Sequence, residues 1–505
     1  MRLRKLASNA AYLTIDWVSI TILSSLFWLT TAHILSPVEL GTVSTAFNFA
    51  SILQFISTLG ISVALSKLIS EYSGSGKVSK IPPIIDSGIK LLLISNVLLT
   101  IIIFIFTPNL SMAIKLAPAA ILISVALAVF LSVSNFTGYI IIGFQDMKKL
   151  MLTDIFYHIS KVVVSVIFIF LGFSFFGPLF GITLGLLFLI LLRLDIFKTF
   201  TLQPKLQYKK EIFRYALPAF VGGIASLAFS NAPYIILTAI KDLSITGIFT
   251  PAMLLATPLF IFPAVFSGAL FPIISSLSVG SRRSAEKSFL VNIVFRYTIF
   301  LTIPLAVFLI IFSSQVVTIL FKPEYLPAVE LLKILSIGAL FQGLSGIFLN
   351  TIYALKKPMV QQNILIVISL FFVLLSLPLT FYFSVVGMSI AYVISTVTLF
   401  VISYFYVRKL VSVHLPYKDI LKVVMATSFL IILLSIVKPT IPNPFSIILI
   451  VPGIVIYFLS LFYLNFYNAL DLRLIGFLEK RAPRQIKLPM NIISRLLKNR
   501  LENTS

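Results

Sequence analysis

Ionisable residues inside apolar stretches are the residues of this sequence best suited to chemistry. Asp154, His158 and Lys161 follow one another at spacings of four and three residues, which places them on one face of a helix. A charged side chain in the hydrocarbon core costs roughly 2.5–3.5 kcal/mol on insertion, so such residues are rare and commonly functional. Because histidine exchanges a proton near neutral pH, this face is a candidate proton site. Asp16, early in the first apolar stretch, is a further candidate for ion coupling.

Each of these residues also has a structural interpretation. Asp16 and Asp154 are compatible with interfacial charge near one membrane surface. Lys161 and a second intramembrane cation, Arg296, are compatible with side chains that extend to the lipid headgroups.

Prolines are concentrated in one part of the chain, and each proline inside a helix removes a backbone hydrogen bond and bends it. We consider two roles for them, bending during gating or static kinks that shape a cavity wall. The prolines of this group are Pro218, Pro233, Pro251, Pro258, Pro263 and Pro272.

Composition identifies a polytopic membrane protein. Of the 505 residues, 59% are hydrophobic and only 11% are charged, which is more apolar surface than a soluble fold can bury. The net charge of +23 lies in short loops between apolar runs, which argues against a nucleic-acid partner. The chain has no cysteine and its three histidines are far apart in sequence, so we expect neither a metal site nor a cofactor.

The apolar runs have the length of membrane-spanning helices, and we expect about 14 of them. The first half gives spans at roughly 12–34, 41–66, 84–106, 117–143, 151–172 and 175–193. The second half gives roughly 214–239, 245–275, 289–312, 328–354, 359–383 and 385–407, followed by a pair at about 420–437 and 445–467. The N-terminal segment is basic and then apolar without a clear cleavage site, so we interpret it as an uncleaved first helix.

Basic residues predict the orientation of these spans. With the N-terminus in the cytoplasm, all but five of the 39 lysines and arginines fall on the cytoplasmic side, which is the distribution that the positive-inside rule requires. The five exceptions are Lys115, Lys241, Lys322, Lys333 and Lys438. We therefore expect an all-α protein with both termini in the cytoplasm. Its predicted parts are an N-lobe (1–193), a basic cytoplasmic linker (194–213), a C-lobe (214–407), two further helices (408–467) and a basic tail (468–505).

The two six-helix halves resemble each other in sequence. The stretches Leu35–Tyr72 and Leu243–Ser278 both begin with Leu-Ser, both carry a glycine soon after, Gly41 and Gly247, and both are rich in small residues later on. An even number of helices in each half makes these parallel repeats, related by a pseudo-two-fold axis along the membrane normal.

Two stretches carry a resemblance to a known family. Leu35–Tyr72 resembles the signature of the polysaccharide-type (O-antigen and oligosaccharide) flippases of the multidrug/oligosaccharidyl-lipid/polysaccharide exporter superfamily. Phe321–Pro358 is similar to their tenth helix and its "G-P-E-Y" lead-in, with Lys322 where a glycine is usual.

The resemblance implies two lobes around a central cavity, alternating access, and flipping of a polyprenyl phosphate- or pyrophosphate-linked oligosaccharide to the outer leaflet of the plasma membrane. The implied partners are this substrate, membrane lipids and glycan assembly enzymes, and we expect a monomer. Such a cavity needs fixed positive charge for the headgroup phosphate. Arg296 is the best candidate because arginine binds phosphate in a bidentate manner, and Lys161 in the other half is a candidate counterpart.

Two other functions remain open at this point. One is export of small amphipathic molecules driven by H⁺ or Na⁺. The other is a membrane glycosyltransferase, which needs an acidic catalytic pair near an outer loop. The acidic residues predicted outside are scattered, at Glu39, Asp242, Glu324 and Glu330, so we expect a transporter and not an enzyme.

Overall fold

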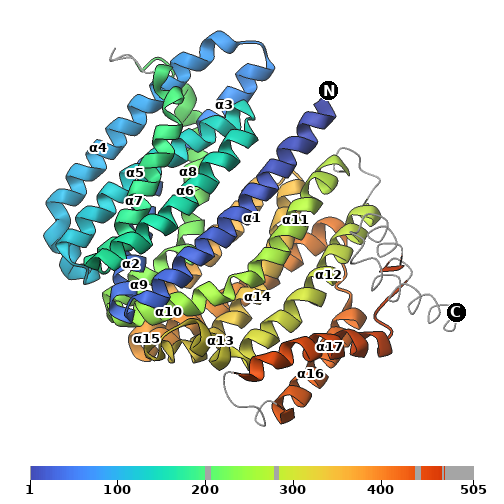
Figure 1. Ribbon diagram of the computed structural model, residues 1–505. Coiled ribbons are helices and arrows are strands. Elements are labelled where there is room, and N and C mark those ends of the chain that lie inside the picture. Colours follow the sequence, from blue (N-terminus) through green and yellow to red (C-terminus); the bar gives the residue numbers. More distant parts are fainter. Residues whose placement is uncertain (1, 200–205, 278–283, 438–444, 469–470, 473–505) are drawn as a thin grey trace. The chain divides into compact units, whose positions relative to one another are not determined.

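The computed structural model describes residues 2–199, 206–277, 284–437, 445–468 and 471–472, and in these ranges the chain is helical without strands (Figure 1). The basic tail from residue 473 and part of the predicted linker lie outside the described residues. The helices are α1 (Arg2–Ile34), α2 (Pro37–Thr58), α3 (Ile61–Gly74), α4 (Ile81–Ile114), α5 (Pro118–Phe144), α6 (Met147–Phe168), α7 (Phe176–Leu192), α8 (Lys209–Ser230), α9 (Ala232–Ile240), α10 (Leu243–Ala256), α11 (Pro258–Leu277), α12 (Ser284–Ile311), α13 (Ser313–Leu320), α14 (Ala328–Ala354), α15 (Pro358–Val411), α16 (Tyr417–Val437) and α17 (Ile450–Tyr463). Short helical turns are η1 (Val78–Lys80), η2 (Ile169–Phe173), η3 (Leu194–Thr199), η4 (Pro323–Tyr325) and η6 (Phe445–Leu449).

Many of these helices are long enough to cross a membrane. Among the described residues, 11 are sufficiently long and apolar, or 12 if the bent pair Lys209–Leu227 and Ala232–Ile240 forms one span. The expectation of an all-helical, multi-pass membrane protein is therefore confirmed. The count of 14 remains a prediction, partly because α15 is a single run of 54 residues in which Ser384 has a non-helical backbone.

Three predicted spans are interrupted. The span expected at 41–66 breaks between α2 and α3, where Leu59 and Gly60 both have positive φ. The span expected at 214–239 bends by 52° between α8 and α9, and the one expected at 245–275 divides into α10 and α11.

Prolines explain part of these interruptions. Pro233 lies in the first turn of α9 and Pro258 begins α11, the positions at which proline is tolerated because no helical N–H is lost. Pro218 lies inside α8 and Pro251 inside α10. Pro263 and Pro272 lie within α11. A gating role for the six prolines remains a prediction.

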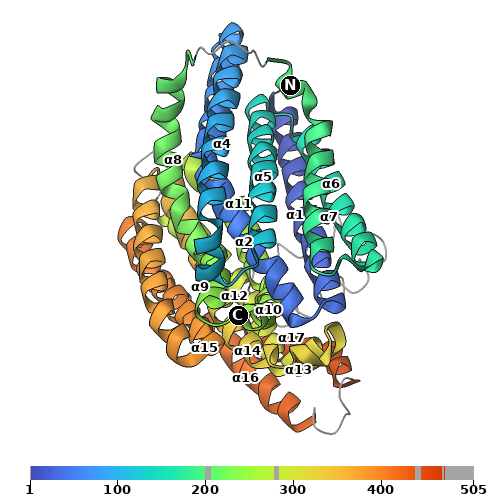
Figure 2. The ribbon, with the colours of Figure 1, turned by 90° about the vertical axis from the view of Figure 1, so that its left-hand side faces the viewer.

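The chain forms two compact units. Unit 1 comprises Met1–Thr257, Val317–Gln342 and Lys357–Ser403, and unit 2 comprises Pro258–Val316, Gly343–Lys356 and Tyr404–Ser505. In unit 1, α6 packs against α1 and α7, while α2 packs against α5 and α10, and α3 packs against α5 and α8. Figure 2 shows α1, α5, α6 and α7 side by side. In unit 2, α12 packs against α11 and α16, and α16 packs against α17. The predicted lobes, their boundaries and their two-fold relation remain predictions.

A close contact between α2 and α10 involves the glycine that the two repeats share. A Cβ atom on Gly41 would lie 1.8 Å from the carbonyl oxygen of Leu243, and one on Gly247 would lie 1.8 Å from that of Pro37. Each glycine thus meets the carbonyl four residues before the other, so the contact is reciprocal. Only glycine allows backbones to approach this closely. We refer to this as the Gly41–Gly247 contact.

Candidate functional site

The interface between α1 and α6 in unit 1 brings together four of the residues that the sequence singles out. On α6 these are Asp154, His158 and Lys161, and on α1 the residue is Asp16. The two helices run in the same direction, because higher residue numbers on α1 meet higher residue numbers on α6. The contacts therefore form a series of levels along the interface, which we call the α1–α6 ladder.

Lys161 lies at the middle of its span. The membrane-spanning segment extends from Met147 to Phe173, so Lys161 is 14 residues, or about 21 Å, from its start. That distance is far greater than a lysine side chain can extend. The length of this helix favours an intramembrane position for Lys161 over one at the headgroups.

The surroundings of Lys161 are apolar and aromatic. The residue is 5% exposed, and its Nζ lies 4.5 Å from the ring centre of Phe27 and 5.6 Å from that of Tyr157. Within the described part of the chain, no carboxylate pairs with this ammonium group. Aromatic faces stabilise a cation, but more weakly than a carboxylate does in a desolvated site. Lys161 is therefore a buried lysine without a carboxylate partner among the described residues.

His158 lies at the next level of the ladder. Its Nδ1 is 3.2 Å from the hydroxyl of Ser24 on α1, and its ring packs beside Tyr157 at 4.6 Å. The residue is buried. A serine hydroxyl can donate to or accept from an imidazole, so this contact is compatible with either tautomer.

Asp154 forms an ion pair that the sequence did not indicate. Its Oδ1 accepts a hydrogen bond of 2.7 Å from Nη2 of Arg193, whose side chain is 1% exposed. Arg193 also donates to the hydroxyl of Thr153 at 2.6 Å and to the carbonyl of Ser134 at 3.3 Å. In the sequence Arg193 follows directly after an apolar run, where it looks like any cation that ends a span. Neither charge nor spacing distinguishes it.

Asp16 lies at the same level as this ion pair. It is 7% exposed and interacts electrostatically with Asp154 and Arg193. Its Oδ1 has no hydrogen-bond partner among the described residues. Two carboxylates and one guanidinium thus share a buried region, which leaves one negative charge unbalanced if both carboxylates are ionised. Such a site favours uptake of a cation, including a proton.

Arg296 belongs to unit 2 and is surrounded by acceptors. Nη1 and Nη2 each donate to the carboxylate of Asp471 at 2.9 Å, and Nη2 also donates to the carbonyl of Phe466 at 2.6 Å. Nε lies 2.9 Å from Oδ2 of Asp419, an ion pair without hydrogen-bond geometry. The hydroxyl of Tyr297 donates to Asp471 as well. The bidentate geometry that phosphate would use is thus taken by a carboxylate, and the role of Arg296 in substrate binding remains a prediction.

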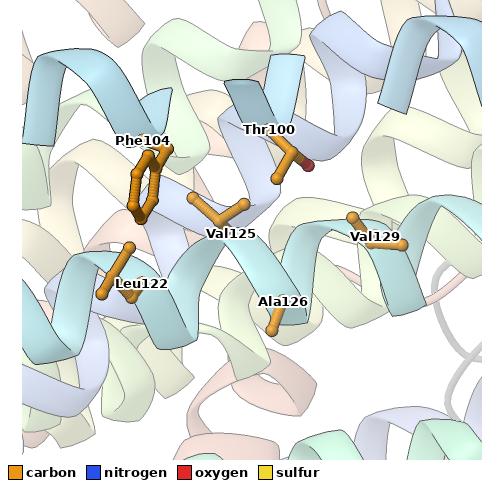
Figure 3. Close-up of a pocket in the computed structure, with 6 residues that line it drawn as sticks. All are labelled: Thr100, Phe104, Leu122, Val125, Ala126 and Val129. Carbon is orange, nitrogen blue, oxygen red and sulfur yellow. The ribbon is translucent and has the colours of Figure 1, made fainter. Parts of the chain in front are cut away.

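An apolar pocket of about 200 Å³ lies between α4 and α5 (Figure 3). Thr100 and Phe104 line it from α4, and the residues from α5 are Leu122, Val125, Ala126 and Val129. The lining has no charged side chain and so does not suit a charged headgroup. Within the described ranges, no group of three or more His, Asp or Glu side chains is placed to hold a metal ion.

Solved structures of membrane transport proteins share this fold. The lipid II flippase MurJ in an inward closed conformation matches with a TM-score of 0.77 at 17% identity, covering 89% of this chain and 98% of that one. An inward-facing multidrug resistance MATE family transporter of the MOP superfamily matches with a TM-score of 0.67 at 16% identity, covering 80% of this chain and 98% of the other. At these identities the similarity establishes the fold.

Sequence comparison gives relatives and a family. The uncharacterized membrane protein MJ1068 of Methanocaldococcus jannaschii is 24% identical over 473 residues, covering 88% of this chain and 92% of the relative. A second uncharacterized membrane protein of that organism, MJ1375, is 25% identical over 409 residues, covering 76% of this chain and 94% of the relative. The model of the polysaccharide biosynthesis protein family matches residues 6–278, which include the whole α1–α6 ladder. The chain is thus a multi-pass membrane protein of the polysaccharide biosynthesis protein family, with the fold of MurJ and the MATE transporters.

Proposed function

We propose that this protein is a transporter that flips a polyprenyl phosphate- or pyrophosphate-linked oligosaccharide from the inner to the outer leaflet of the plasma membrane by alternating access. The observation that carries the proposal is Lys161, a buried lysine in the middle of a candidate span without a carboxylate partner among the described residues. An uncompensated charge at this depth is costly to a protein that has no use for it. An anionic headgroup that crosses the membrane supplies the missing negative charge.

The family supports a role in polysaccharide assembly, and the fold is shared with a lipid II flippase. In the proposed mechanism Lys161 binds the headgroup phosphate as a compact point charge, and the polyprenyl chain stays in or near lipid. Arg296 is the second candidate for this phosphate, and there the anion would have to displace Asp471. The other proposed partners are membrane lipids and glycan assembly enzymes, with the protein acting as a monomer.

We assign ion coupling to the part of the α1–α6 ladder that precedes Lys161. Asp16, Asp154 and His158 are the candidates, and Asp16 has a carboxylate oxygen without a hydrogen-bond partner in the described part of the chain. Asp16→Asn should flatten the pH dependence of transport, because an amide cannot exchange the proton. An unchanged pH profile in both Asp16→Asn and Asp154→Asn would rule out a coupling role for these carboxylates.

A second candidate function is export of small amphipathic molecules, which the similarity to a MATE transporter favours. Both functions use the same fold, and they differ in the substrate. A proteoliposome assay separates them: a fluorescent polyprenyl-linked sugar is added, and its transfer between leaflets is followed with a membrane-impermeant quencher.

The lysine provides the decisive test. We expect Lys161→Ala and Lys161→Met to reduce flipping by roughly tenfold or more, because a charge-assisted contact to phosphate is worth about 1.5–3 kcal/mol. Lys161→Arg should retain part of the activity. Lys161→Met should also be at least as stable as the parent, because it removes a buried charge without a counter-ion. Lys333→Ala, which removes an exposed lysine, is the matched control. Flipping at the parental rate in Lys161→Met would refute the proposal.

A further inference from the structure

Lys115 and Lys322, two of the five basic residues predicted to lie outside the cytoplasm, make equivalent contacts at one end of unit 1. Nζ of Lys115, just after α4, donates to the carbonyl of Lys241 at 2.6 Å and lies 3.4 Å from that of Ile240, the last residue of α9. Nζ of Lys322, just before η4, donates to the carbonyl of Ile34, the last residue of α1, at 2.5 Å. Both lysines therefore bind carbonyls at the end of a helix, where the last turn has no intrahelical donor and the helix dipole is negative.

The two contacts are reciprocal between the halves of the sequence. Lys115 belongs to the first half and binds the second, and Lys322 belongs to the second half and binds the first. We call them the lysine clasps. Further contacts join the same segments: the hydroxyl of Tyr325 donates to the carbonyl of Leu35, and Nδ1 of His33 lies 3.0 Å from the carbonyl of Leu320. Burial raises the pKa of Tyr325, so its hydroxyl remains a donor.

The lysine clasps occur at the same end of unit 1 as the Gly41–Gly247 contact, because Gly41 lies seven residues after Ile34 and Gly247 six residues after Lys241. Figure 1 shows α2, α9 and α10 together at this end of the unit. Hydrogen bonds between hydroxyls also cross from half to half in this region: Thr45 and Thr238 are bonded at 2.7 Å, and Thr250 donates to Ser44 at 3.1 Å. The charge distribution predicts that this end faces outside.

We propose that the lysine clasps are a latch that holds this end of the protein closed and must open when the two halves of the sequence separate. Each clasp joins an ammonium group on one half to backbone carbonyls on the other, so separation breaks both. Exposed interactions of this kind are weak, which allows them to open and reform. The inference concerns opening alone and does not depend on the identity of the substrate.

The test uses the absence of cysteine from the chain. Ser44 is fully buried beside the Gly41–Gly247 contact, and Ser44→Cys is a nearly isosteric reporter whose reaction with a maleimide requires separation of α2 from α10. We expect Lys115→Gln and Lys322→Gln each to raise the labelling rate about two- to five-fold in the purified full-length protein, and the double variant to raise it by about the product.

Two controls make the result specific. Lys333→Gln removes one positive charge from an exposed lysine that pairs only with its neighbour Glu330 in the described contacts, and it should leave the rate unchanged. Ser62→Cys, a buried reporter on α3, should label at the same rate with and without the clasps. An unchanged rate at Ser44→Cys in the double variant would overturn the proposal. An equal rise at both reporters would also overturn it, because it would indicate general loosening.

Discussion

The Gly41–Gly247 contact makes a quantitative prediction about packing. In Gly41→Ala the new methyl group would begin 1.8 Å from the carbonyl oxygen of Leu243, whereas real Cβ atoms essentially never approach another atom within 3.0 Å. Because the methyl group would meet a backbone carbonyl and not a side chain that could change its rotamer, α2 and α10 must move apart. Overpacking of this kind costs about 1–3 kcal/mol. The separation also lengthens the hydrogen bond between Thr45 and Thr238, whose loss costs about 1 kcal/mol more.

Part of this cost is offset, because alanine stabilises a helix interior by about 1 kcal/mol relative to glycine. We therefore expect Gly41→Ala to lower the free energy of unfolding by about 1–3 kcal/mol. Gly247→Ala should have the same effect, since its methyl group would meet the carbonyl of Pro37 at the same distance. The double variant should cost less than the sum, because helices already separated by one methyl group have room for the second.

Unfolding of the purified protein in detergent, followed by denaturant titration, measures these effects. Gly346→Ala on α14 is the matched control: a Cβ there would meet nothing within 4 Å, so this variant should be stabilised by about 0.5–1 kcal/mol. Parental stability in Gly41→Ala, or full additivity of the two substitutions, would show that the two helices are not in this contact.

Three further predictions concern charge. Arg193→Ala and Asp154→Ala should each destabilise the protein by about 3–5 kcal/mol and the double variant by less than the sum, in a double-mutant cycle of unfolding free energies; additive losses would exclude the buried pair. Asp471→Asn should lower thermal stability because it weakens the bidentate bond to Arg296, whereas faster flipping at unchanged stability would mean that Asp471 blocks a phosphate site. Cysteines at the exposed positions Val78 and Met112, near opposite ends of α4, should react from opposite sides of the membrane, with Met112→Cys labelled from outside in intact cells; the reverse pattern would invert the predicted orientation.

Local periodicity made much of the fold predictable from sequence. The length of an apolar run can be read from the sequence without knowing which other helices pack against it, so the helical, membrane-spanning character follows directly from these runs. The spacing of Asp154, His158 and Lys161 correctly placed them on one helix, α6, but it did not show that Asp154 pairs with Arg193. The break at Leu59–Gly60 was missed, because glycine in an apolar run is common and a left-handed leucine has no sequence signal.

The pairing of charges was not predictable in this way. The partners of Arg296 lie more than a hundred residues later in the sequence. One of them is the backbone carbonyl of Phe466, and because every residue has such a carbonyl, the sequence does not indicate which one will accept the bond. The environment of Lys161 was also not predictable, because the sequence does not show that Phe27 of α1 and Tyr157 surround its ammonium group. The contacts of Lys115 and Lys322 were not predictable, since nothing in a sequence shows which carbonyl a lysine will meet.

The buried ion pairs of the two units also differ in when they can form during synthesis. Asp154 and Arg193 are 39 residues apart, one on α6 and the other directly after α7, so the arginine can enter the bilayer with its counter-ion already present. Arg296 and Asp471 are 175 residues apart, which at about 5–20 residues per second means about 9 to 35 seconds of translation between them. During that interval α12 holds a guanidinium whose strongest partner does not yet exist. A nascent chain arrested before Asp471 should therefore remain a substrate for membrane chaperones and quality-control proteases, even when every helix of unit 1 is already in place.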